Sequence, residues 1–228
     1  MTFDPKLKPL SLDDADMEAL FGDARLAKQL RFILEVEKLK TVLRRTPLLD
    51  ISRRENDAEH TWQLAMMAVI LAEYADETID LTRVLKMILI HDVVEIDAGD
   101  TFIYDSVAMQ DQEEREKLAA DRLFGLLPED QCKEFRAYWD EFEARTTADA
   151  RFARAIDRLQ PLLHNFFTSG GTWHSPGVHR DLVLERKTPI GKSSSRLWDA
   201  AQTLIHEGVK REFLPETLAD NPLSPAAE

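Results

Sequence analysis

Residues 88–100 read I-L-I-H-D-V-V-E-I-D-A-G-D, an apolar run that nevertheless carries a histidine, aspartates and a glutamate. An ionised carboxylate in such surroundings is costly unless a positive group compensates its charge. Lys86 lies six residues before Asp92 and therefore off its helical face, and the next base downstream is Arg115. A bound metal ion is the more economical counter-charge.

Two more polar residues stand in places where a metal site would need them. His60 lies in the first turn of a predicted helix that begins E-N-D-A-E-H, and Asp157 interrupts the apolar face of R-F-A-R-A-I-D-R-L-Q-P-L-L. With His91 and Asp92 they supply two neutral imidazoles and two carboxylates, whose charges neutralise a divalent ion. Mixed nitrogen and oxygen ligands suit manganese, cobalt, zinc, nickel or ferrous iron better than calcium. Four protein ligands leave coordination positions open for water and a substrate oxygen.

The composition limits the classes of partner and compartment. The chain has 228 residues and a formal net charge of −13, which argues against a nucleic-acid polymer or an anionic membrane as its main partner. Cys132 is the only cysteine, so no intrachain disulfide can form. The N-terminus lacks the apolar core of a signal peptide, and the longest apolar stretch, 84–96, is too short to span a bilayer. These features predict a cytoplasmic protein without a membrane segment.

The elements that must position these residues are helical almost throughout, because no convincing alternating strand pattern is present. We therefore predict one all-α domain over residues 1–228, with residues 221–228 as a frayed tail. Expected N-caps are Asn56 or Asp57, Asp80 or Thr82, and Thr147. The main predicted helices cover residues 24–45, 58–74, 80–99, 110–127, 129–145, 148–168 and 194–210.

The motif order resembles a known family. E-H, then H-D-x-x-E with G-D shortly after, then a later lone aspartate in a helix, is similar to the HD-domain metal-dependent phosphohydrolases, and within them to the 5′-deoxynucleotidase-like branch. The resemblance implies a helical HD-domain bundle with its metal-site core at about 25–168 and a helical and loop extension at 171–228. It also implies a homodimer and a single divalent ion (Mn, Co, Zn, Ni, Fe or Mg) on four ligands: His60, His91, Asp92 and Asp157.

The resemblance extends to residues that would handle the substrate. Arg45 occupies the place of an arginine that binds the substrate phosphate, Glu95 matches the acid that orients the attacking water, and Asp100 matches the acid near the scissile oxygen. A metal activates water, carboxyl groups move protons, and a guanidinium stabilises phosphate charge. Thr46 departs from the pattern, because nucleotidase members have a tryptophan there, and this leaves deoxynucleotide specificity open.

Each of these residues also has an ordinary structural explanation. Glu95 is an alternative hydrogen-bond partner of His91, and Asp100 an alternative turn residue at a helix end. Arg45 can interact with the C-terminus of its own helix, which favours cations. Arg53 and Arg54 are alternative phosphate ligands.

The sequence thus predicts a metal-dependent phosphohydrolase that releases phosphate from a small phosphate monoester, with a nucleoside 5′-monophosphate as the leading candidate. One alternative substrate is another phosphorylated or pyrophosphate-type metabolite. The alternative class is a regulatory HD protein that binds metal or nucleotide without turnover. If Glu95, Asp100 and Arg45 all line the metal cavity, hydrolysis is favoured; if Arg45 points away, binding without turnover gains support.

Overall fold

The computed structural model describes residues 8, 10–221 and 223, and nearly all of its regular structure is helical, which confirms the all-α prediction. The predicted tail lies outside the described residues except for Asn221 and Leu223. No helix in the described part of the chain combines the length and apolar character that a membrane crossing requires. In chain order, with 3₁₀ helices labelled η, the elements are α1 (Asp14–Phe21), α2 (Ala24–Val36), η1 (Glu37–Thr41), β1 (Leu43–Pro47), β2 (Arg54–Asn56), α3 (Asp57–Leu71), η2 (Ala72–Tyr74), α4 (Leu81–His91), η3 (Asp92–Val94), α5 (Glu95–Ala98), α6 (Gln112–Phe124), α7 (Glu129–Ala144), α8 (Ala148–Phe167), η4 (Gly171–His174), α9 (Arg180–Lys187), η5 (Thr188–Lys192), α10 (Ser195–Lys210) and η6 (Leu218–Asp220).

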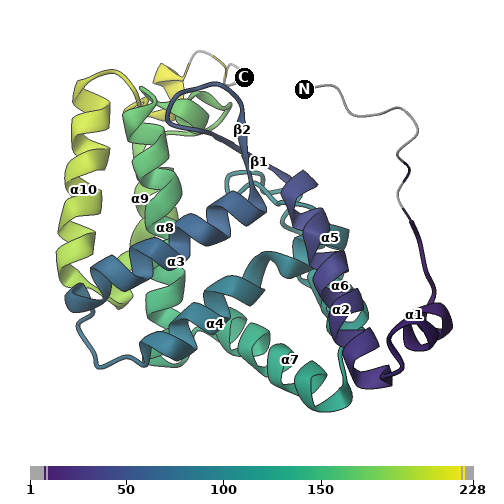
Figure 1. The fold of residues 1–228 in the computed structure, drawn as a ribbon. Helices are drawn as coiled ribbons and strands as arrows, with labels where there is room; N and C mark the ends of the chain where they lie inside the picture. Colours follow the sequence, from purple (N-terminus) through teal and green to yellow (C-terminus); the bar gives the residue numbers. More distant parts are fainter. Residues whose placement is uncertain (1–7, 9, 222, 224–228) are drawn as a thin grey trace.

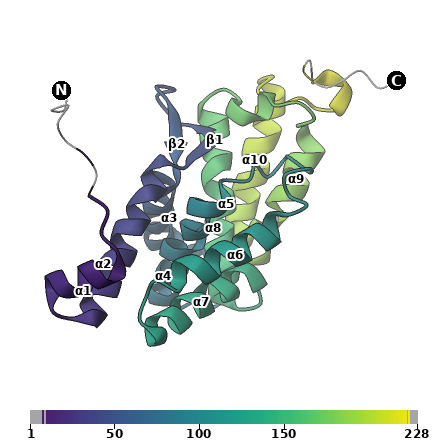
Figure 2. The same cartoon turned by 90° about the vertical axis from the view of Figure 1, so that its right-hand side faces the viewer.

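The helices form two groups that α3 and α4 join. Helices α8, α9 and α10 lie together at one end of the molecule, while α2, α5 and α6 lie at the other (Figures 1 and 2). Helix α4 packs against α3, α7 and α8. Its Met87 and Ile88 belong to the larger buried cluster, and Ile90 belongs to a second cluster with α6 and α7 residues. The C-terminal end of α4, with His91 and Asp92, therefore lies where the two cores meet.

Local capping explains where three of these helices begin. Asn56 caps α3 through a capping box with Glu59, Asp80 caps α4, and Thr147 caps α8. In each case a side-chain oxygen accepts a hydrogen bond from a backbone N–H that has no partner inside the helix. The sequence left Asn56 or Asp57, and Asp80 or Thr82, as alternatives, and the structure selects the first of each pair.

The predicted helix over 24–45 is wrong in its last third. Helix α2 ends at Val36, and the chain continues through η1 into β1, which pairs antiparallel with β2. Pro47 has no N–H and favours an extended conformation at Thr46, so this segment suits a short strand better than a helix. Two short strands with a bulge in their register give too little alternation for a sequence pattern to reveal them.

The predicted helix over 80–99 is interrupted at Asp92, one of the predicted metal ligands. After His91 the backbone of Asp92 has φ −90° and ψ 0°, and η3 follows before α5 ends at Gly99 with φ 75°. This conformation lies in a sparsely populated region that is common in active sites. Asp92 is therefore rotated from the position that a regular α-helix would give it beside His91.

A buried lysine joins α9 to α8. Lys187 is 1% exposed, and its Nζ donates a hydrogen bond to the backbone carbonyl of Arg158 at 2.9 Å. Burial, reinforced by the nearby guanidinium of Arg158, lowers the pKa of Lys187 to about 7. The cation is therefore disfavoured in the folded protein.

We expect Lys187→Met to stabilise the fold by about 1–3 kcal/mol at pH 7, because it removes an amine whose solvation is lost on folding. Between about pH 7 and pH 10 the unfolded chain carries a proton on Lys187 and the folded chain does not, so wild-type stability rises with pH by up to about 1.4 kcal/mol per unit. The advantage of the variant should accordingly shrink as pH rises. Urea unfolding at several pH values measures this, with the exposed Lys192→Met as a matched control. An advantage that does not change with pH would contradict the explanation.

Candidate metal and active site

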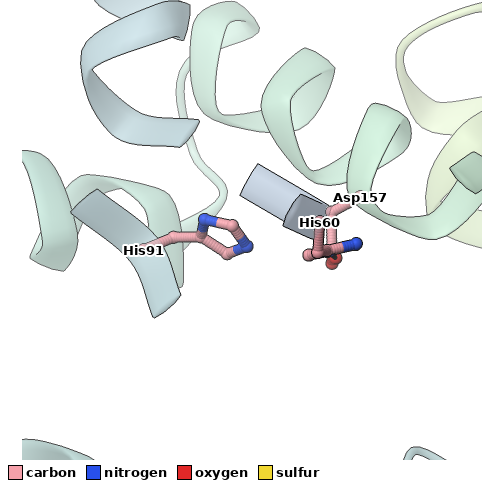
Figure 3. A group of neighbouring side chains, drawn as sticks. All are labelled: His60, His91 and Asp157. Atoms are coloured by element: carbon pink, nitrogen blue, oxygen red, sulfur yellow. Dashed lines mark hydrogen bonds and ion pairs between the residues drawn. The ribbon is translucent and has the colours of Figure 1, made fainter. Parts of the chain in front are cut away.

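Four segments bring the predicted metal ligands together. His60 lies in the first turn of α3, His91 ends α4, Asp92 begins η3, and Asp157 lies near the middle of α8. In Figure 3 the ring of His91 points across a gap toward His60 and Asp157, which belong to two other helices. One ligand atom from each of these three residues lies within 4.8 Å of the others. Asp92 adds an oxygen 2.9 Å from His91 Nε2 and another 3.9 Å from His60 Nε2.

Hydrogen bonds on the far side of each imidazole fix its orientation. Nδ1 of His91 donates to the backbone carbonyl of Ile88 at 2.7 Å, and Nδ1 of His60 lies 3.1 Å from Oε1 of Gln160. Gln160 in turn donates to Glu55, which identifies its Oε1 as the acceptor for His60. Such partners hold metal-binding histidines in the tautomer whose other nitrogen is free to bind an ion.

The inward-facing atoms need a cation between them. Nε2 of His91 is buried without a hydrogen-bond partner in the described structure, although Asp92 Oδ1 is close by. Burial and Arg44 oppose protonation of His60, but Asp157 and Glu55 outweigh them and raise its pKa to about 9. The Asp92 charge likewise overcomes burial and raises the pKa of His91. A site that raises histidine pKa values in this way also favours a divalent ion, so the residues fit a metal.

The acids of the site divide into two kinds. Burial opposes ionisation of Asp157, but the Arg158 charge and the His60 hydrogen bond hold its pKa well below the ordinary value. Burial and the neighbouring carboxylates raise the pKa of Glu95 well above its ordinary value, and burial also raises that of Asp100. Two sets of carboxyl groups with pKa values shifted in opposite directions are typical of a division between charge-holding and proton-transferring roles.

Asp57 is a further acid of the site, and it was identified from the sequence only as a candidate helix N-cap. It is fully buried at the start of α3, and burial together with Asp92 raises its pKa to about 7. Its ligand atom lies within 4.8 Å of those of Asp92 and Glu95. An acid in the first turn of a helix is normally explained by the helix dipole, so no sequence signal distinguishes this one.

The guanidinium inside the site belongs to Arg44. Its Nη1 lies 3.2 Å from Asp57, 3.3 Å from Asp92 and 3.5 Å from Asp100, and its side chain is 13% exposed. Arg45, the predicted phosphate ligand, has a 54% exposed side chain that lies over the Phe102 ring. Side chains alternate between the two faces of a strand, so an inward Arg44 in β1 requires an outward Arg45.

The alternative arginines are engaged elsewhere. Arg53 pairs with Glu59 at 2.9 Å, and Arg54 donates to the backbone carbonyls of Leu43 and Arg44. Neither lines the cavity at the site.

A cavity of about 690 Å³ connects the site to the surface. Three of the proposed metal ligands, His91, Asp92 and Asp157, line it with Glu95, Asp100 and Arg44, whereas the fully buried His60 lies behind this lining. Basic residues of α8 and α9, two of them beside Asp157, also line it, and they were not singled out from the sequence. The volume lies within the range of small-molecule sites.

Comparison with known proteins gives consistent matches. The model of a family described as "HD domain" matches residues 36–198. Human 5′-deoxynucleotidase HDDC2 is 30% identical over 197 residues, which cover 78% of this chain and 95% of that protein. The bovine protein of the same name is 31% identical over 135 residues, covering 59% of this chain and 64% of that protein.

Two solved structures are also similar to this chain. A crystal structure described as a "predicted metal-dependent phosphohydrolase" from Magnetospirillum magnetotacticum MS-1 is 58% identical, covers 86% of this chain and 98% of its own, and superposes with a TM-score of 0.82. A protein from Pyrococcus horikoshii OT3, 19% identical with a TM-score of 0.56, covers 77% of this chain and 99% of its own and shares the fold. Because the family match spans more than half of the sequence and accords with the clustered histidines and aspartates, the chain belongs to the HD domain family.

Proposed function

We propose that the chain is a metal-dependent phosphohydrolase that releases phosphate from nucleoside 5′-monophosphates. The observation that carries this proposal is that ligand atoms of His60, His91 and Asp157 lie within 4.8 Å of one another, and that His91 and Asp157 line one cavity with Glu95 and Asp100. The similarity to curated 5′-deoxynucleotidases and to a crystallised phosphohydrolase supports it.

The proposed metal ligands are the two imidazoles and two carboxylates of His60, His91, Asp92 and Asp157. When bound, a divalent ion lowers the pKa of water and polarises a phosphoryl oxygen. The donor set accepts Mn, Co, Zn, Ni, Fe or Mg, and the ion available in the cell decides among them.

The remaining polar residues handle protons and phosphate charge. Burial and the neighbouring carboxylates raise the pKa of Glu95 and so favour its neutral form, and the charge of a bound divalent ion would oppose this shift. In its ionised form Glu95 orients the attacking water and accepts its proton. Asp100, whose pKa is also raised, donates a proton to the departing alkoxide. Arg44 takes the role that the resemblance assigned to Arg45, because its guanidinium is the one that lines the cavity between these acids.

A phosphate-release screen tests this function. Nucleoside monophosphates and sugar phosphates are incubated with the full chain and Mn²⁺, Co²⁺ or Mg²⁺, beside an Asp92→Ala control. We expect release from one or more nucleoside monophosphates by the wild type and none above background by the control. Release that is equal in both proteins would discredit catalysis at this site, and metal or nucleotide binding without release would favour the regulatory alternative, with which the outward position of Arg45 agrees.

We also propose a homodimer, because α3 presents an apolar stripe to solvent. Trp62, Met66, Val69 and Ile70 follow helical spacing and are 44–67% exposed. Exposed apolar surface of this kind is typical of a protein interface. We expect the wild type to sediment as a dimer and Trp62→Glu as a monomer. Leu118→Glu, a change at an exposed leucine of α6, is the matched control and should leave the mass unchanged. A monomeric wild type would contradict the proposal.

A further inference from the structure

One wall of the cavity, here called the α8–α9 wall, carries the guanidinium groups of Arg154, Arg158 and Arg186. Two of them lie beside Asp157, a proposed metal ligand. Arg154 and Arg158 come from neighbouring turns of α8 and Arg186 from α9, and all three line the cavity. None of them was singled out by the sequence motifs, because each stands in a helix whose charged residues look like an ordinary solvated face. They line one space because η5 packs against α8 and α9 packs against η5.

This wall carries more positive than negative charge. Arg154 and Arg158 share a single carboxylate oxygen, Oδ2 of Asp157, at 3.3 and 3.8 Å. The other oxygen of Asp157 faces His60 at 3.2 Å and belongs to the proposed metal site. Asp157 is therefore shared between His60, the proposed metal site and two guanidinium groups, and Glu143 is a further acid whose charge acts on Arg158.

Arg186 has no carboxylate within ion-pair distance among the described residues. Glu185 lines the same wall, but its side chain forms no ion pair with any of the three arginines within 4.0 Å. Nε of Arg186 and Nε of Arg154 are both buried without a hydrogen-bond partner in the described structure. Buried guanidinium groups normally find partners, so these donors indicate that a ligand completes the site.

The charge of Arg44, unlike that of Arg186, is compensated by nearby carboxylates. Its guanidinium faces three of them within 3.5 Å. The positive charge of the wall also acts on Lys187: burial is the largest cause of its lowered pKa and Arg158 the next, with smaller contributions from Arg44 and Arg154 and an opposing one from Asp157. The cavity thus has an acidic end, where Arg44 is compensated, and a basic wall where two guanidinium groups share one carboxylate oxygen and Arg186 forms no ion pair among the described residues.

We propose that Arg154, Arg158 and Arg186 form an anion site that binds a second phosphate group of the substrate, away from the phosphate that is released. This inference rests on the proposed phosphohydrolase function and changes its substrate from a nucleoside monophosphate to a nucleotide with two phosphate groups. Guanidinium groups match the geometry and charge of phosphate through paired N–H donors. The second phosphate can be contiguous with the first, as in a nucleoside diphosphate, or attached to the other end of the sugar, as in a nucleoside 3′,5′-bisphosphate.

Calorimetric titration of the full chain tests this assignment in EDTA, where turnover does not compete with binding. The probes are adenosine 5′-monophosphate, 5′-diphosphate and 3′,5′-bisphosphate. We expect one of the two doubly phosphorylated probes to bind about 10- to 100-fold more tightly than the monophosphate, and the preferred probe identifies the position of the second phosphate. Arg186→Ala should abolish most of this preference with little change in monophosphate affinity. Arg151→Ala, on α8 but paired with Glu77 outside the cavity, should keep it.

The outcomes separate this inference from the proposed function. Equal binding of all three probes would overturn the second-phosphate site, even in a protein that releases phosphate. An Arg186→Ala variant that loses as much affinity for the monophosphate as for the doubly phosphorylated probe would also overturn the second-phosphate site. In that case the three arginines would bind the single phosphate of the monophosphate. A preference for a doubly phosphorylated probe without phosphate release in the metal-supplemented screen would instead refute the enzyme. Thermal melting of each variant identifies unfolding, and Arg186→Lys serves where the alanine variant is unfolded.

Discussion

Glu95→Gln should lower kcat for phosphate release by about 10²- to 10⁴-fold, the usual contribution of a positioned proton acceptor. The substitution keeps the size and packing of a side chain that is 8% exposed but removes its ability to take up a proton. Because burial and the nearby carboxylates already favour the neutral carboxyl group, the fold should not be weakened. KM should stay within about threefold of wild type, since the change affects proton transfer more than substrate binding.

The matched control is Glu116→Gln, which alters another buried acid of the same cavity that bonds to Gln112. It should retain activity within about threefold of wild type. Metal content, measured by mass spectrometry on both purified variants, should match the wild type. A Glu95→Gln protein with unchanged kcat would remove Glu95 from the reaction, and one that lost its metal would reassign it as a ligand, as its proximity to Asp57 and Asp92 permits.

Arg44→Ala should destabilise the protein by about 3–5 kcal/mol, because it leaves buried carboxylates without their shared counter-charge. For a chain of this size the melting temperature should fall by about 10 °C. The loss in free energy of unfolding relative to the wild type should become smaller as pH is lowered from 7 to 5, because protonated Asp57 and Asp100 carry no charge that needs a cation. The direction follows from their pKa values, which burial raises to about 7 for Asp57 and above the ordinary value for Asp100.

The neighbouring residue supplies the control. Arg45→Ala removes an exposed guanidinium that lies over Phe102 and 3.9 Å from Asp105, so it should cost less than about 1 kcal/mol. Chemical denaturation of both variants at pH 7 and pH 5 makes the comparison. Equal losses from Arg44→Ala and Arg45→Ala would mean that the acids around Arg44 are compensated by something other than its charge.

The sequence predicted the helices and the metal ligands because both depend on local signals. Caps such as Asn56 and Asp80 act on backbone groups two or three residues away. His91 and Asp92 stand out because an acid inside an apolar run requires compensation wherever the run is buried. The structure places His60 and Asp157 beside them, although 97 residues separate these two in the chain.

Local signals could not predict which of the two adjacent arginines faces the acids. Arg44 and Arg45 are adjacent and identical, and their roles depend on which face of β1 meets the acids, a one-residue register that the pairing with β2 sets. The interruption of α4 at Asp92 is also a tertiary effect, because an unbroken helical pattern would continue through it.

Local signals in the sequence were enough to predict that this chain is helical and that its buried acids and imidazoles, on separate helices, form a metal site. Periodicity, capping and the cost of an uncompensated charge all operate within a few residues. Three features appear in the folded chain alone: Arg44 rather than Arg45 faces the acids, Asp57 joins them, and Arg154, Arg158 and Arg186 line one wall. Those arrangements depend on how η5 and β1 pack against α8 and on how α9 packs against η5, and such packing is set by contacts between residues far apart in the chain.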